Sequence, residues 1–193
     1  WLRKTNCLGF KISELIVVGD SAGGNLATAM CYKCTTEDII APDALVLHYP
    51  ALDLSNTPHA SRVLFMDDPV VPFPAVTKCR DAYLGPTEEL DSDLYLDPFV
   101  SPSFGTDKMI QGLPNSVHIY AAEYDPLADE AIHFAERLMN AKKEVHFGCH
   151  QNMPHGYLTL ARYTPDAVKL VQDHGHMLAE IVQSLRKKAQ TAS

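Results

Sequence analysis

Three side chains of the sequence could together carry out nucleophilic catalysis, and the first of them is a serine. Ser21 lies in Gly19-Asp20-Ser21-Ala22-Gly23, the Gly-x-Ser-x-Gly pattern of a serine on a sharp turn between a strand and a helix. The glycines two residues to either side would let the backbone pass closely. The Ala22 N–H, at the start of the helix, could stabilise an oxyanion. We therefore predict a nucleophilic serine rather than a glycine-rich turn capped by serine.

A nucleophilic serine needs an imidazole base, and the imidazole needs a carboxylate that fixes its tautomer. In parallel α/β sheets such groups lie in loops just past the carboxyl ends of strands. Asp125 and His155 occupy two such loops, in the order serine, acid, histidine. Asp129 is the alternative acid, but we interpret it as a solvent-facing or capping residue of a helix. His150 is the alternative base, and there a polar strand terminus is the simpler interpretation.

The other histidines of interest have structural or solvated interpretations. His48 lies inside a predicted buried strand, where a core or pocket-lining histidine is expected. His133, His174 and His176 lie on predicted helices, where we expect solvated faces.

Two further clusters could suggest a metal ion, but neither has the required spacing. Cys31 and Cys34 form a lone Cys-x-x-Cys pair, whereas structural zinc takes four ligands. The acidic residues Asp91, Asp93 and Asp97 lack the glycine and glutamate positions of a calcium loop. We therefore predict no metal ion and no organic cofactor.

The elements that must position these residues alternate along the chain. Apolar β-branched runs predict strands, and apolar residues at helical spacing predict helices. A segment rich in Pro, Asp and Ser, residues 51–113, is interpreted as an excursion over the sheet. The alternation predicts an α/β fold with a mostly parallel sheet covered by helices on both faces. Strands are expected at 15–18, 44–49, 116–122 and 144–149, and helices at 22–33, 72–83, 126–142 and 165–187, the last with Val168 and Val171 buried.

Composition and charge exclude several classes of protein. The 193 residues are 46% hydrophobic and 21% charged, which predicts one globular unit with a sizeable core. Asp and Glu number 24 against 16 Lys and Arg, so the net charge is −8 and nucleic acid is not an expected partner. No window holds the roughly 18 consecutive apolar residues of a transmembrane segment. The five scattered cysteines indicate a reducing compartment rather than a disulfide framework.

These motifs resemble the hormone-sensitive lipase family of α/β-hydrolase esterases. The similar segments are Gly-Asp-Ser-Ala-Gly-Gly-Asn-Leu at 19–26, Asp-Pro-Leu at 125–127 and Pro-His-Gly-Tyr-Leu-Thr-Leu at 154–160. Residues 61–83 and 158–161 resemble the lipases after which the family is named. The resemblance implies a serine hydrolase of acylglycerols and cholesteryl or retinyl esters, in the cytoplasm and at lipid droplets. It also implies that Ser21 is the nucleophile, Asp125 the acid and His155 the base.

The family also places a His-Gly-Gly-Gly segment and further strands upstream of the nucleophile, and this chain has neither. We therefore expect residues 1–193 to be the C-terminal portion of one α/β-hydrolase catalytic domain, and a poor enzyme when isolated. Only the short run 85–96 stands where the vertebrate lipases carry a long phosphorylated insertion. The 51–113 excursion is expected to be cap-like. Its side chains Phe65, Met66, Val70, Val71 and Phe73 would line an apolar acyl pocket, with ordinary packing against the sheet as the alternative.

Two other functions remain open. The chain could be a catalytically silent α/β-hydrolase-like binding domain, because a fold does not secure an activity. It could also be a carboxylesterase of the same family that acts on small esters.

Overall fold

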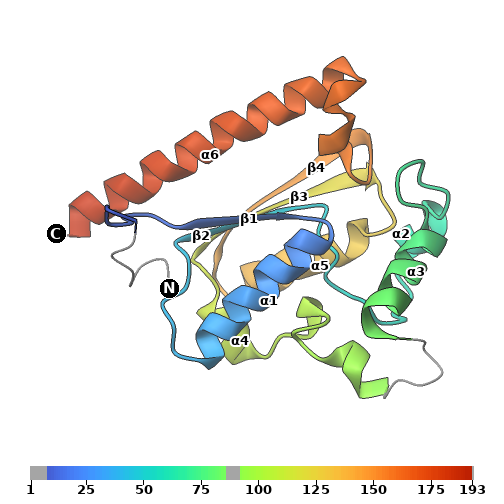
Figure 1. Cartoon of the computed structure of the whole chain (residues 1–193), viewed down its shortest axis with the longest axis horizontal. Coiled ribbons are helices and arrows are strands. Elements are labelled where there is room, and N and C mark those ends of the chain that lie inside the picture. Colours follow the sequence, from blue (N-terminus) through green and yellow to red (C-terminus); the bar gives the residue numbers. More distant parts are fainter. Residues whose placement is uncertain (1–7, 86–91, 193) are drawn as a thin grey trace.

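The structure is a computed structural model that describes residues 8–85 and 92–192. Its centre is one parallel sheet whose four strands lie in chain order (Figure 1). The predicted α/β class with a parallel sheet is therefore confirmed. The strands are β1 (Ile16–Asp20), β2 (Ala44–His48), β3 (Ser116–Tyr124) and β4 (Glu144–Pro154).

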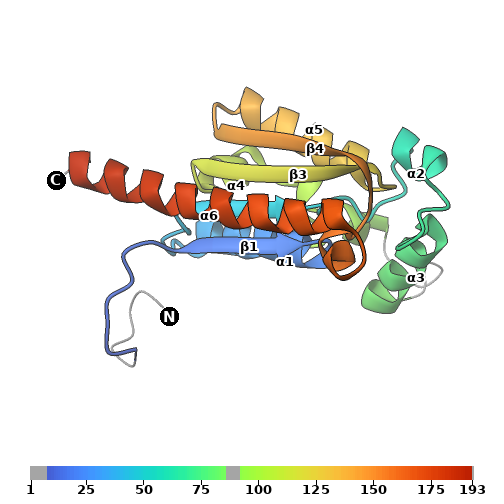
Figure 2. The same cartoon turned by 90° about the horizontal axis from the view of Figure 1, so that it is seen from above.

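Helices cover both faces of this sheet, as Figures 1 and 2 show. Alternate residues of β2 point to opposite faces, so Leu45 and Leu47 join the core on one side and Ala44 and Val46 pack near Ile181 on the other. No helix in the described ranges is long and apolar enough to cross a membrane. One face carries α1 (Ala22–Thr36), α4 (Asp107–Gly112) and α5 (Ala128–Asn140), and the other carries α6 (Pro165–Ala192).

The 51–113 excursion leaves the sheet at the carboxyl ends of the strands, where α2 (Ala60–Leu64) and α3 (Phe73–Leu84) lie (Figure 1). The sequence predicts one short helix there, and the structure has more, because helices of five or six residues show no periodicity to detect. The short helix α4 is not part of a cap, since its Ile110 is buried in the core beside α1. The excursion contains α2 (Ala60–Leu64), α3 (Phe73–Leu84), the 3₁₀ turns Ser92–Leu96 and Pro102–Phe104, and α4.

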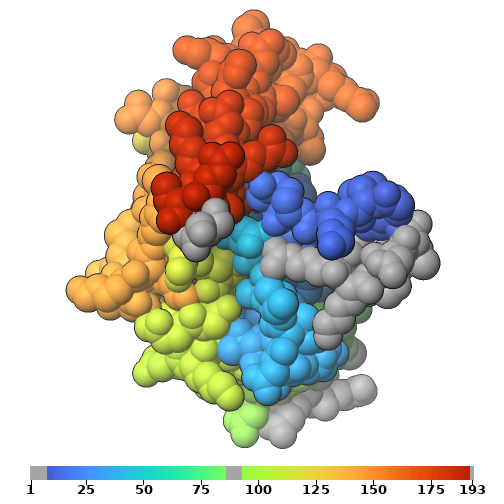
Figure 3. Space-filling view, turned by 90° about the vertical axis from the view of Figure 1, so that its left-hand side faces the viewer, coloured from blue at the N-terminus to red at the C-terminus, as the bar shows by residue number. Residues whose placement is uncertain are grey.

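The long helix α6 differs from its prediction at both ends. Val168 and Val171 are exposed, whereas His174, expected on a solvated face, is buried. This first half of α6 packs beside the 3₁₀ turn Tyr157–Arg162, where an imidazole rather than an aliphatic side chain fills the contact. The helix continues to Ala192 and passes the segment that leads into β1 (Figure 3). There Arg186 Nε lies 3.4 Å from Glu14 Oε1.

An aromatic cluster joins the carboxyl half of the sheet to α6. The ring of His174 stacks on that of His48 with centroids 4.5 Å apart, and its Nε2 lies 2.9 Å from Nε2 of His150. Tyr120 stacks against His48 and His150, and the hydroxyl of Tyr157 lies 3.3 Å from Nδ1 of His48. Burial and the neighbouring histidines lower the pKa of His48 to about 3 and that of His174 to about 4, although Asp173 opposes the second shift.

We expect this cluster to make stability fall as the solution is acidified. The unfolded chain binds protons at these imidazoles near their usual pKa of 6.5, whereas the folded chain resists protonation until about pH 4. The free energy of unfolding therefore falls by about 1–3 kcal/mol as the pH falls through that window. Urea unfolding of the complete protein from about pH 7 to about pH 4.5 measures the slope. His174→Gln should flatten it, and the exposed His176→Gln should not; equal slopes would contradict the assignment.

Candidate active site

Ser21 lies on a strained turn between β1 and α1, where the sequence predicts it. Its φ is 50°, which is uncommon for a residue other than glycine. Backbone hydrogen bonds hold this conformation: the Ser21 N–H donates to the His48 carbonyl at 2.9 Å, and the Ser21 carbonyl accepts from Ala51 N–H at 3.1 Å. The turn therefore fixes the serine at the carboxyl end of the sheet.

Two close backbone approaches make this turn possible, and one of them differs from the prediction. A Cβ at Gly19 would collide with the carbonyl of Gly23, as expected of the glycine that precedes the serine. A Cβ at Gly23 itself would meet nothing nearer than 3.6 Å. The second tight contact is at Gly24, where a Cβ would lie 2.7 Å from Cβ of Pro50. The packing of α1 against the loop after β2 therefore requires glycine one position later than the pattern indicates.

This difference predicts unequal effects of two neighbouring alanine substitutions. Gly24→Ala should destabilise the complete protein by about 1–3 kcal/mol, because Pro50 is rigid and cannot move aside. Gly23→Ala should change stability by no more than about 1 kcal/mol, since alanine is the better helix former and has room. Urea unfolding measures both, and equal losses would contradict the contact geometry.

The structure brings the three side chains singled out from the sequence into one hydrogen-bonded chain. Ser21 Oγ lies 2.8 Å from His155 Nε2, and His155 Nδ1 lies 2.9 Å from Asp125 Oδ2. An ionised carboxylate can only accept, so Nδ1 of the imidazole carries the proton and donates it. In a neutral ring Nε2 is then an acceptor, and it receives the hydroxyl of Ser21. The arrangement leaves Ser21 Oγ with a base that is in position to remove its proton.

Asp125 and His155 are both buried, with 0% and 2% of their surface exposed. Asp125 follows β3, and its Oδ1 accepts the Leu127 N–H at 2.8 Å, which directs Oδ2 toward the imidazole. The ring of Tyr49 lies edge-on to that of His155 with centroids 4.9 Å apart. The carboxylate and the imidazole are therefore held by backbone and packing contacts as well as by each other.

The alternative acid and bases take structural places. Asp129 accepts the Ser61 N–H at 2.9 Å and so connects α5 to α2. His150 lies within β4, which continues to Pro154, so it is not the strand terminus that we expected. His48 is a buried core histidine, as predicted.

Sequence reasoning missed two residues around this site. Asn25 donates from Nδ2 to the carbonyls of Ala51 and Val100, at 2.9 and 2.8 Å, and so connects α1 to the excursion. The buried Asp68 accepts the backbone N–H of His155 at 2.8 Å. The sequence signal at Asp68 is local, an Asp-Pro pair typical of a turn, and it gives no hint of the contact with His155.

The residues expected to bind substrate do not all lie together in the structure. Ala22 is the first residue of α1, so its N–H has no carbonyl partner within the helix. Val70 lies against the residue after His155, since a Cβ at Gly156 would be 3.3 Å from its Cγ1. The ring of Phe65 lies 5.7 Å from that of Tyr124. Met66 is exposed, Val71 is partly buried, and Phe73 faces the guanidinium of Arg62 at 5.5 Å.

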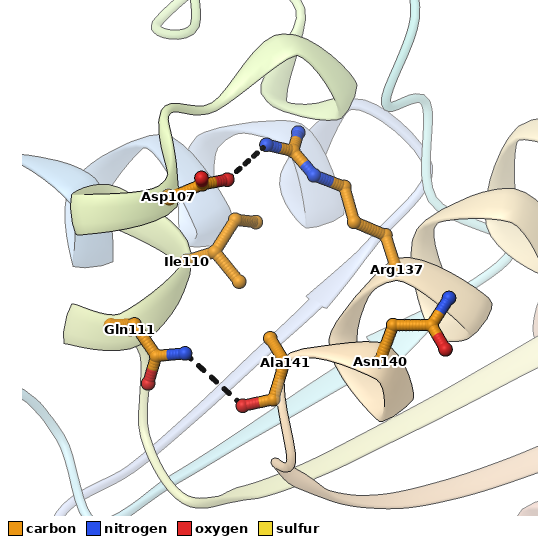
Figure 4. A pocket seen from close by; sticks show the side chains of 6 residues that line it. All are labelled: Asp107, Ile110, Gln111, Arg137, Asn140 and Ala141. Carbon is orange, nitrogen blue, oxygen red and sulfur yellow. Dashed lines mark hydrogen bonds and ion pairs between the residues drawn. The ribbon is translucent and has the colours of Figure 1, made fainter.

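A cavity of about 350 Å³ lies away from these residues, between α4 and α5. Figure 4 shows its polar lining, in which Arg137 reaches toward Asp107 and Gln111 donates to the carbonyl of Ala141. It lies at the end of α5 farthest from Asp125. In residues 8–85 and 92–192 no group of three or more His, Cys, Asp or Glu is placed to hold a metal ion. Asp91, one of the acidic residues considered for calcium, is outside those ranges.

The chain is similar to known proteins of the alpha/beta hydrolase fold. A family model described as the alpha/beta hydrolase fold matches residues 1–159. An esterase of Acinetobacter venetianus is 28% identical over 177 residues, which cover 92% of this chain and 54% of that protein. Human hormone-sensitive lipase is 39% identical over 82 residues, 42% of this chain and 8% of the lipase. The crystal structure of carboxyl esterase 2 from Tuber melanosporum aligns with a TM-score of 0.79 at 23% identity, covering 91% of this chain and 56% of that one.

Proposed function

The chain belongs to the alpha/beta hydrolase fold family, and from this premise we propose that it carries the reaction centre of a serine carboxylic-ester hydrolase. The observation that supports this most is the continuous chain from Ser21 Oγ through His155 to Asp125, with distances of 2.8 and 2.9 Å. The similarity to esterases over 92% of the chain supports the same class of reaction. A binding domain would have no need to keep all three groups in contact.

The reaction proceeds through an acyl-enzyme. As Ser21 Oγ attacks the ester carbonyl carbon, His155 Nε2 takes the hydroxyl proton, and Asp125 stabilises the imidazolium that forms. The negative oxygen of the tetrahedral intermediate accepts a hydrogen bond from the N–H of Ala22, and further donors are expected from the rest of the catalytic domain. The intermediate collapses when His155 returns the proton to the departing alcohol. Water, activated by the same imidazole, then attacks the acyl-enzyme and releases the acid.

We propose that the substrates are lipid esters, acylglycerols or cholesteryl and retinyl esters, hydrolysed in the cytoplasm or at lipid droplets without a cofactor. The 39% identity to human hormone-sensitive lipase over 82 residues supports this class. Exposed apolar side chains of the excursion support it as well. Val63 and Leu64 are 70% and 73% exposed, and Met66 and Val70 follow them, so an acyl chain or a lipid surface would cover them.

The activity proposed is that of the complete protein. Relatives such as the esterase from Acinetobacter venetianus match most of this chain, but the chain spans only about half of their length. For that esterase the share is 54%. We propose that residues 1–193 form the C-terminal portion of one catalytic domain. Within the described residues β1 pairs with β2 alone, which leaves its other edge available for a further strand.

A fluorophosphonate probe tests this function, because it reacts covalently with an activated serine. The complete wild-type protein should be labelled stoichiometrically at Ser21 and should hydrolyse p-nitrophenyl butyrate. A folded protein that is not labelled would be a catalytically silent binding domain. If labelling occurs but hydrolysis is confined to short acyl chains, the protein is a small-ester carboxylesterase rather than a lipase.

A further inference from the structure

The carboxylate of Asp68 joins two segments that are far apart in the sequence. Its side chain is only 4% exposed. Oδ1 accepts the N–H groups of Val70 and Val71 at 2.7 and 2.6 Å, and Oδ2 accepts the backbone N–H of His155 at 2.8 Å. A buried carboxylate is costly unless it is well hydrogen-bonded, and here three backbone donors stabilise it.

A local role explains only one of the two oxygens. An Asp that bonds to amides two and three residues later makes a common turn, and Oδ1 does this with Val70 and Val71. Oδ2 has no part in that turn. It reaches across 87 residues of sequence to the amide of the residue whose side chain is the base of the proposed reaction.

A second contact between the same segments lies one residue further on. Gly156 has φ of 69°, and a Cβ there would lie 3.3 Å from Cγ1 of Val70. The loop after β4 is therefore in contact with residues 68–70 through its backbone at His155 and through close packing at Gly156. Asp125 holds the ring of His155, and Asp68 holds its main chain.

The excursion that carries Asp68 is itself anchored to the element that follows Asp125. Arg62 on α2 forms an ion pair with the buried Glu130 of α5, with Nη2 and Oε2 2.8 Å apart. Burial raises the pKa of Glu130 to about 7, and the charge of Arg62 opposes that shift. Ser61 adds a bond from its hydroxyl to the Pro126 carbonyl at 2.9 Å. Asp125, α2 and Asp68 thus belong to one connected unit. This unit contacts His155 twice, at the ring through Asp125 and at the backbone N–H through Asp68.

We propose that Asp68 is a positioning residue for His155: its carboxylate holds the backbone of the base so that Nε2 stays within reach of Ser21. This inference rests on the proposed function, in which His155 is the base. A displacement of a reacting group by about 1 Å can cost on the order of 10²-fold in rate. We therefore expect the loss of this single backbone contact to lower kcat about 100-fold without changing how substrate binds.

Three variants of the complete protein separate this role from a merely structural one. Asp68→Asn retains the shape but replaces one acceptor oxygen with a donor, so it opposes one set of N–H groups. Asp68→Ser keeps a short acceptor for the turn at Val70 and Val71 but cannot reach His155. Asp67→Asn is the matched control, because Asp67 is the exposed neighbour of Asp68 and the charge change is the same.

The measurements are kcat and KM for p-nitrophenyl butyrate, with active sites counted by fluorophosphonate titration. Asp68→Ser should lower kcat per titrated site about 100-fold with KM within about twofold, and Asp67→Asn should match wild type. Asp68→Asn should fall between them, because its one remaining acceptor oxygen can still face the His155 N–H. A value of kcat per site close to wild type in Asp68→Ser would overturn the proposal. So would a loss of activity explained entirely by fewer titratable sites, which is the signature of misfolding.

Amide hydrogen exchange separates failure of this inference from failure of the proposed function. If wild type is not labelled at Ser21, the proposed function is wrong whatever Asp68 does. The His155 amide should still exchange faster in Asp68→Ser than in Asp67→Asn, since only the first removes its acceptor. Equal exchange in the two variants would overturn the positioning role independently of any esterase assay.

Discussion

Replacing Ser21 with alanine should abolish both fluorophosphonate labelling and ester hydrolysis while leaving the protein folded. The substitution removes one oxygen, whose hydrogen bond is to Nε2 of His155 at 2.8 Å. The backbone bonds of the turn, from the Ser21 N–H to His48 and from Ala51 to the Ser21 carbonyl, involve no side-chain atom and remain. Loss of the nucleophile of a comparable triad costs on the order of 10⁶-fold in kcat.

The assay compares the complete wild-type protein with Ser21→Ala, using p-nitrophenyl butyrate for turnover and urea unfolding for stability. We expect unfolding curves that differ by no more than about 0.5–1 kcal/mol, since no packed group is lost. Residual labelling or turnover at the wild-type rate would show that another residue is the nucleophile. A large loss of stability would instead show that the hydroxyl has a structural role that the geometry does not indicate.

The sheet and the serine turn are the parts of this molecule most readily predicted from sequence. Apolar β-branched runs such as that ending at Val18 are short and bounded by glycine or proline, and each of the four expected strands is present within a few residues. The position of Ser21 follows from local sequence alone. The proximity of Asp125 and His155 was predictable because parallel strands deliver the loops after them to one edge of the sheet.

What sequence could not provide are contacts between distant segments. The link from Asp68 to His155 depends on where the excursion folds back, and nothing local to Asp68 specifies that. The burial of His174 was missed for a related reason, since helical periodicity assumes an apolar partner whereas the facing surface is built of His48, His150 and Tyr157. Short helices such as α2 are held by tertiary bonds rather than by their own periodicity.

His150 of β4 and His155 in the loop after it should respond very differently to substitution. His155→Ala should lower kcat by several orders of magnitude, because it removes the only group bonded to both Ser21 Oγ and Asp125 in the described structure. His150→Ala should leave kcat within a few-fold, because its Nε2 faces His174 at 2.9 Å in the aromatic cluster against α6. Its cost should appear in stability, as the loss of ring packing with Tyr120 and Tyr157.

Measuring kcat and urea unfolding for both variants of the complete protein separates these effects. Below the temperature at which either variant unfolds, the ratio of the two kcat values reports chemistry alone. Equal losses in kcat, or a greater loss in His150→Ala, would show that His155 is not the base. A loss of kcat in His155→Ala with fluorophosphonate labelling still as fast as wild type would be equally contradictory, because activation of Ser21 is the step proposed for His155. His150 and His155 therefore provide a matched pair close in sequence, one bonded to His174 in the aromatic cluster and the other to Ser21 Oγ.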